Sequence, residues 1–208
     1  MKATLNPNDS LVLAVTVHHD ADCESPTTWD GWRLYSFGHR HANYADPSDF
    51  ICELGRSPDE VVAKPEVRAK LDSGLAHWLS YYEHGGCRWS LIGEGPQCPW
   101  DTVRFAGILV WESEPNDLGA GTVEARQSDA RAFLDTYSDW CNGFCYGYSI
   151  ECEGELIDSC FGFIGADSLG EAVSSAIESW RGGQGESAGK RSVTVKGEAA
   201  HALTLSNL

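Results

Sequence analysis

Hydrophobic and polar positions alternate in short blocks along this chain, a pattern that predicts strands and helices of ordinary length separated by turns. β-Branched and apolar residues fill 11–18 in the manner of a buried strand, and runs of similar length recur downstream. We expect strands at 11–18, 29–37, 88–92, 102–112, 144–152, 156–163 and 191–196. Glu153-Gly154 lies between two of these runs and predicts a hairpin.

Three further segments carry helical signals. We expect helices over 58–82, 122–140 and 168–180. Pro58, Asp59 and Glu60 suit a first turn, because proline loses no hydrogen bond there and carboxylates complement the helix dipole. Pro65 is expected to break or restart the first helix, and Asn142-Gly143 to end the second.

Strands and helices do not alternate strictly, so the expected fold class is α+β, a mostly antiparallel sheet packed with two to three helices. Residues 1–166 are expected to form a single core domain. Residues 167–208 are expected to add a helix, a Gly-rich linker at 181–189 and an edge strand or tail. The polar segment 39–58 is long for a loop in a compact domain, and such loops are often functional.

The charge balance is strongly acidic. In 208 residues, 15 Lys and Arg stand against 31 Asp and Glu, a formal net charge of −16. This field repels phosphate backbones, so we expect no direct binding of nucleic acid. The charge suits either a basic protein partner or plain solubility. The sequence has no run of 18 apolar residues and no basic and apolar leader, so we expect a cytoplasmic location away from membranes.

Eight cysteines occur without a C-x-x-C spacing. They stand at positions 23, 52, 87, 98, 141, 145, 152 and 160. In a chain without an export signal we expect all of them to be free thiols, most of them packed as small apolar residues.

A series of short motifs follows the chain in order. They are Ser25-Pro26, Trp29-Asp30, His39-Arg40, Tyr82-Glu83-His84-Gly85-Gly86, Cys98-Pro99-Trp100-Asp101, Tyr146-Gly147, Glu151 and Asp158–Gly165. Together they resemble an uncharacterised family found in phages and bacterial mobile elements, with blocks S-P-x-x-W-D, H-R, Y-D-H-S-G, C-P-W-D and D-S-C-W-G-F. Gly31 and Glu83 depart from the Asn and Asp of that pattern. The resemblance implies a mobile-element origin and a shared core, and it implies no activity.

Histidines and aspartates near the first strand form one candidate site. The set is His18, Asp20, Asp22, His39 and His41. Imidazole and carboxylate groups hold zinc or manganese, and a bound water could then be activated for hydrolysis. The other interpretation is that these are surface and hydrogen-bonding residues. We expect no cofactor, with zinc or manganese as the alternative.

A second candidate set combines a thiol, an imidazole and a carboxylate. It consists of His84, Cys98, Asp101 and Cys160, which could supply a nucleophile, a base and an orienting group. The alternative is that Cys98 and Trp100 pack in the core while Asp101 caps a turn. The eight Trp, seven Tyr and seven Phe likewise suit either a core or a recognition surface.

These observations lead to one main expectation and two alternatives. The main one is a non-enzymatic acidic protein that binds and inhibits a host nucleic-acid-binding protein of a defence system by mimicking nucleic acid. The alternatives are a metal-dependent hydrolase using the His/Asp set and a protein that binds a small molecule or nucleotide. The residues expected to bind are Asp129, Asp135, Asp139, Trp29, Asp30, His39, Arg40, His84, Trp100 and Asp101.

Overall fold

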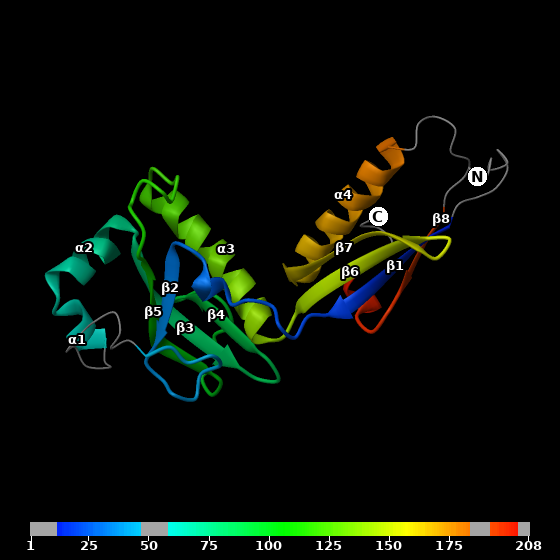
Figure 1. Ribbon diagram of the computed structural model, residues 1–208. Helices are drawn as coiled ribbons and strands as arrows, with labels where there is room; N and C mark the ends of the chain where they lie inside the picture. Colours follow the sequence, from blue (N-terminus) through cyan, green and yellow to red (C-terminus); the bar gives the residue numbers. More distant parts are fainter. Residues whose placement is uncertain (1–11, 47–57, 184–191, 204–208) are drawn as a thin grey trace. The chain divides into compact units, whose positions relative to one another are not determined.

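The computed structural model describes residues 12–46, 58–183 and 192–203, and the chain divides into two compact units (Figure 1). Unit 1 joins Met1–Glu24 to Gly143–Leu208, and unit 2 is Ser25–Asn142. This division differs from the expected core at 1–166, because the first strand pairs with strands that follow residue 143. Cys52, much of the expected loop and linker, and the last five residues lie outside the described residues.

Unit 1 contains a four-stranded sheet of mixed direction. Its strands are β1 (Val12–His19), β6 (Cys145–Cys152), β7 (Glu155–Ile164) and β8 (Ser192–Lys196), in the order β7-β6-β1-β8. β1, β6 and β7 pair antiparallel, whereas β8 pairs parallel to β1. The expected hairpin is confirmed: Glu153 and Gly154 have φ values of 52° and 85°, as a tight turn between twisted strands requires.

Helix α4 (Ala166–Gly183) packs on one face of this sheet (Figure 1). Apolar residues at helical spacing on α4 meet alternate residues of the strands, which is why one face of each element is buried. The contacting residues include Leu13, Val15, Val17, Tyr146, Tyr148, Ile150, Leu169, Val173 and Ile177. The short helix η3 (Ala200–Ala202) closes the same core.

Unit 2 contains a four-stranded antiparallel sheet. Its strands are β2 (Trp32–Ser36), β3 (Ala76–Glu83), β4 (Cys87–Leu91) and β5 (Thr102–Trp111), in the order β2-β5-β3-β4. A 3-10 turn, η1 (Pro26–Thr28), precedes β2, and Ser25 caps it by accepting the N–H of Thr27.

Helices pack against both faces of the unit 2 sheet. α3 (Val123–Cys141) packs through Leu134 against Leu109 and Trp89. The short helices α1 (Pro58–Val62) and α2 (Pro65–Ser73) pack on a second cluster that includes Ile108 and Val110. Because side chains alternate along β5, neighbouring residues of one strand serve different cores.

The helix expected over 58–82 was wrong beyond Ser73. Gly74 adopts a left-handed φ of 74°, and its N–H bonds to the carbonyls of Leu71 and Lys70, which ends α2. The aromatic segment that follows becomes β3, paired with both β4 and β5. Within the described residues there are four α-helices and two mostly antiparallel sheets, so the α+β class is confirmed. None of the helices in the described ranges is long and apolar enough to cross a membrane.

Candidate functional site

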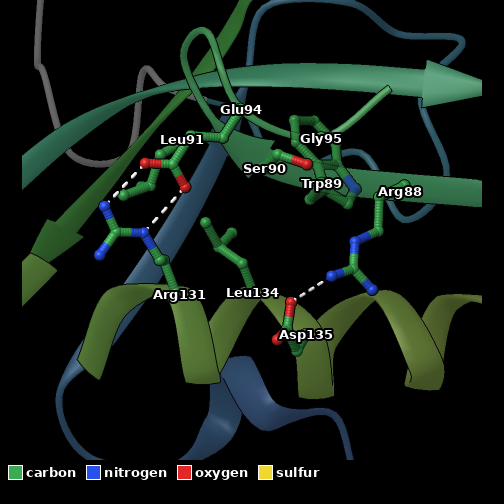
Figure 2. Close-up of a pocket in the computed structure, with 9 residues that line it drawn as sticks. All are labelled: Arg88, Trp89, Ser90, Leu91, Glu94, Gly95, Arg131, Leu134 and Asp135. Atoms are coloured by element: carbon green, nitrogen blue, oxygen red, sulfur yellow. Dashed lines mark hydrogen bonds and ion pairs between the residues drawn. The ribbon is translucent and has the colours of Figure 1, made fainter. Parts of the chain in front are cut away.

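The acids expected to bind along α3 already have contacts inside unit 2. Asp129 Oδ1 accepts a hydrogen bond from the indole N–H of Trp32 at 2.7 Å. Asp135 forms an ion pair with Arg88 of β4 (Figure 2). Asp139 lies one helical turn beyond Asp135. Two of the three carboxylates therefore join α3 to the sheet, and α3 is not a free acidic face.

A small pocket of about 170 Å³ lies between α3 and β4 (Figure 2). Arg131 donates two hydrogen bonds to the carboxylate of Glu94, at 2.8 and 2.7 Å, and these bonds lower the pKa of Glu94. Leu134 points into the space between this pair and the Arg88–Asp135 pair. Drug-sized ligands occupy clefts of about 300–1,000 Å³. The pocket is smaller than this, and the guanidinium groups of Arg88 and Arg131 are already paired with carboxylates. We therefore interpret it as part of the packing contact between α3 and β4 and not as a ligand site.

The structure brings together three of the four residues of the Cys/His/Asp set. Cys98 Sγ donates to Asp101 Oδ2 at 3.2 Å, and His84 Nδ1 lies 3.4 Å from the same oxygen. A cysteine nucleophile needs its base in contact with the thiol. Here the Asp101 carboxylate contacts both the Cys98 thiol and the His84 ring. In a nucleophile–base–orienter arrangement the imidazole would contact the thiol instead. Cys160 lies on β7 of unit 1.

Beside this cluster, Trp100 is 92% exposed, which overturns the alternative that it packs in the core. The side chain of His84 is 73% exposed, and the Glu83 N–H bonds to the Asp101 carbonyl at 3.0 Å, so the two loops meet. An indole held open to solvent beside a short polar cluster can serve as an anchor for a partner.

The other expected binding residues of unit 2 are also at its surface. Trp29 is 46% exposed, and its carbonyl accepts a hydrogen bond from the guanidinium of Arg33. Asp30, His39 and Arg40 are exposed. The His39 ring packs on Tyr44 with centroids 4.3 Å apart. Seven other aromatic residues in the described part of the chain are buried in the cores: Trp32, Tyr81, Trp89, Trp111, Tyr137, Tyr146 and Tyr148.

The proposed metal ligands are divided between the two units. His18, Asp20 and Asp22 belong to unit 1, and His39 and His41 belong to unit 2. Within 12–46, 58–183 and 192–203, no three His, Cys, Asp or Glu side chains are grouped so that they could hold a metal ion. The zinc or manganese alternative therefore has no geometric support in that part of the chain.

Most of these side chains instead have identifiable protein partners. His18 Nε2 lies 3.2 Å from Ser149 Oγ. Asp20 accepts the N–H of Asp22 at 3.2 Å and the N–H of Gly162 at 2.9 Å. These contacts organise the end of β1, in agreement with the interpretation as hydrogen-bonding residues.

His41 serves a structural purpose in unit 2. Its Nδ1 lies 2.7 Å from the hydroxyl oxygen of the fully buried Ser36, and its ring packs on Tyr81 with centroids 4.4 Å apart. Burial lowers the pKa of His41, so the folded protein favours the neutral imidazole.

Reasoning from the sequence missed the acidic face of α4. Asp167, Glu171 and Glu178 are exposed and line an open depression together with Gly170, Ser174 and Ser175. Their spacing of i, i+4 and i+11 places the three carboxylates within one narrow stripe of the helix. The spacing of these three acidic residues is present in the sequence and is the signal that could have identified the stripe.

The described part of unit 1 is acidic well beyond this stripe. Its acidic residues are Asp20, Asp22, Glu24, Glu151, Glu153, Glu155, Asp158, Asp167, Glu171, Glu178 and Glu198. The basic residues in that part are Arg181 and Lys196, and Lys196 lies 4.0 Å from a carboxylate oxygen of Glu151. Unit 1 therefore contributes a strongly negative field.

Comparison of the chain with protein-family models, with curated proteins and with solved structures finds no match.

Proposed function

We propose that this chain is an acidic protein of phage or mobile-element type that binds a basic, nucleic-acid-binding host defence protein and inhibits it by occupying its nucleic-acid site. The observation that carries the proposal is the acidic stripe Asp167, Glu171 and Glu178 on the outer face of α4. The order of the short sequence motifs supports the mobile-element origin.

The spacing of the stripe suits a site built for phosphates. At a rise of about 1.5 Å per residue, Asp167 and Glu171 are separated by about 6 Å along the helix, and Glu171 and Glu178 by about 10 Å. One DNA strand carries a phosphate about every 3.4 Å along its axis. The separations therefore approximate two and three phosphate steps.

The residues between the carboxylates leave this face open. Gly170, Ser174 and Ser175 line the same depression and carry no bulky side chain. Long basic side chains of a partner can thus reach the carboxylates without displacing anything from α4. Arginine is favoured for such contacts because its planar fork binds a carboxylate through two hydrogen bonds.

A charged face of this kind governs encounter and specificity more than affinity. Exposed charges are screened over a Debye length of about 8 Å at physiological salt, so apolar anchors are needed for a long-lived complex. Leu156 and Phe161 of β7, in the same unit as the stripe, are exposed apolar side chains that can supply such anchoring.

The first test is direct capture. The chain is immobilised, exposed to nuclease-treated bacterial lysate at low salt, and then washed with short duplex DNA. We expect a nucleic-acid-binding protein to be retained and then displaced by the DNA, because both would compete for one basic site. The chain itself should not shift DNA or RNA in a gel. Recovery of only proteins that DNA does not displace would contradict the proposal.

A further inference from the structure

Two cysteines that are far apart in the sequence meet at the end of α3. Cys87 is the first residue of β4, and Cys141 is the last residue of α3. The two thiols share a hydrogen bond in the reduced protein. Two thiols that share a hydrogen bond are neighbours, and a disulfide between them requires an S–S bond of about 2 Å.

Hydrogen bonds from Asn142 and Asn43 hold the two cysteines next to each other. Asn142 directly follows Cys141, its Oδ1 accepts the N–H of Cys87 at 2.8 Å, and its Nδ2 donates to the carbonyl of Cys87 at 2.8 Å. Asn43 Nδ2 donates to the sulfur of Cys141 at 3.1 Å. The backbone of one cysteine and the sulfur of the other are therefore both held in place.

The shared hydrogen bond makes the two thiols unequal. It is the largest influence on Cys87, whose pKa it lowers, and it raises the pKa of Cys141. A thiolate is the reactive form of cysteine. The lowered pKa of Cys87 favours this thiol as the group that attacks an oxidant, and the adjacent Cys141 is placed to resolve the product.

We propose that Cys87 and Cys141 form a peroxide-reactive dithiol that oxidises to an intramolecular disulfide between β4 and α3. The Cys87 thiolate attacks one oxygen of hydrogen peroxide, which breaks the O–O bond, forms a sulfenic acid after proton uptake and releases water. The sulfur of Cys141 then attacks the Cys87 sulfur and displaces hydroxide, which leaves as water with the Cys141 proton. In total, two thiols are oxidised to a disulfide and one peroxide is reduced to two waters.

Burial selects a small oxidant. Cys87 is only 9% exposed and Cys141 is half-buried. Hydrogen peroxide can reach such a sulfur, whereas the disulfide of another folded protein cannot approach it without opening the unit. The site therefore differs from a thiol exchange site, which must be accessible to a second protein.

A second thiol pair in unit 1 provides an internal comparison. Cys23 and Cys145 also share a hydrogen bond, but burial is the largest influence on Cys23, and the pKa of Cys23 is raised. With less thiolate available, this pair should react more slowly with peroxide than Cys87 and Cys141.

The test treats the full folded chain with hydrogen peroxide, blocks the remaining thiols with iodoacetamide and maps cross-linked peptides by mass spectrometry. We expect a Cys87–Cys141 cross-link and a mass loss of two hydrogens, both appearing before any Cys23–Cys145 cross-link. The oxidised protein should melt at least about 5 °C higher, because the disulfide restricts the unfolded chain. Absence of the Cys87–Cys141 cross-link in folded protein would overturn the proposal.

A pair of variants tests which sulfur reacts first. In Cys141→Ser the sulfenic acid cannot be resolved, so dimedone should label Cys87 after peroxide treatment. In Cys87→Ser, dimedone labelling of Cys141 should be several-fold weaker. Equal labelling in the two variants would show that the dithiol lacks the assigned asymmetry and would reject the mechanism.

Discussion

The side-chain amide of Asn142 pairs with both backbone groups of Cys87, as a neighbouring strand would. Both hydrogen bonds measure 2.8 Å. β4 is an edge strand of the unit 2 sheet, and two residues beyond Cys87 the Trp89 N–H donates to Ser138 Oγ at 3.0 Å. Side chains of α3 thus cover backbone groups that an edge strand would otherwise expose to other chains.

Asn142→Ala should lower the free energy of unfolding by about 2–3 kcal/mol. The change removes three hydrogen bonds, two to the backbone of Cys87 and one to the carbonyl of Ser138, and leaves a partly buried N–H and C=O of Cys87 without their partner. Urea unfolding measures the loss. Asn116→Ala, at an exposed turn, is the matched control and should change stability by less than about 0.5 kcal/mol. Equal losses in both variants would contradict the role of Asn142.

Stability should fall as the pH drops below about 6.5, the ordinary histidine pKa. Burial lowers the pKa of both His41 and His77 in the folded state. The unfolded chain therefore takes up protons first, so the unfolding free energy is full above pH 6.5 and declines toward the folded-state pKa values. The lowered pKa of Glu94 affects the unfolding free energy only below pH 4.5, its ordinary pKa, and so does not contribute to the change below pH 6.5.

Thermal melts at pH 7.5 and 5.5 measure this pH effect. His41→Gln should reduce the difference between the two melting temperatures. If His41→Gln shows the full wild-type difference, His41 does not contribute to the pH dependence.

Gly107→Ala should destabilise unit 2 by about 3 kcal/mol or more. A Cβ at this position would lie 2.3 Å from the backbone oxygen of Tyr35, and neither strand can move without breaking the pairing of β2 with β5. Gly121→Ala is the control, because a Cβ there meets no described atom within 4 Å. Chemical denaturation compares the two, and a tolerated Gly107→Ala would contradict the close strand approach.

Asp129→Ala should cost about 1–2 kcal/mol of stability. The nearly buried indole of Trp32 loses its charged acceptor at 2.7 Å. Ser128→Ala, exposed on the same helix, should be close to neutral. A change at Asp129 without any stability loss would mean that its carboxylate is free for other contacts, as the sequence had suggested.

Local patterns in the sequence predicted the elements with strong local signals. The helix at 122–140 and the hairpin around Glu153-Gly154 are confirmed, because amphipathic spacing and turn chemistry are local properties. The strand Ala76–Glu83 was missed, although Gly74 provided a stop signal for the preceding helix and the aromatic run favoured a strand.

Long-range pairing was beyond the reach of the sequence pattern. β1 pairs with β6 and β8, which follow more than a hundred residues later. The alternation of apolar residues within β1 does not indicate which strands it pairs with. The division into two units depends on this pairing. The candidate site was affected likewise: Asp129 and Asp135 look like solvent-facing acids in the sequence, but Trp32 and Arg88 approach them only in the folded unit.

The acidic stripe of α4 is the central claim, and association kinetics test it most directly. The recovered partner is mixed with wild-type chain, with Asp167→Asn/Glu171→Gln/Glu178→Gln, and with the equally neutralised control Glu66→Gln/Asp72→Asn/Asp117→Asn of unit 2. Exposed charge steers encounter and is screened by salt. We predict that the α4 variant associates at least about tenfold more slowly at low salt and loses most of its salt dependence, while the control resembles the wild type. Equal association rates and equal salt slopes for all three would contradict the account.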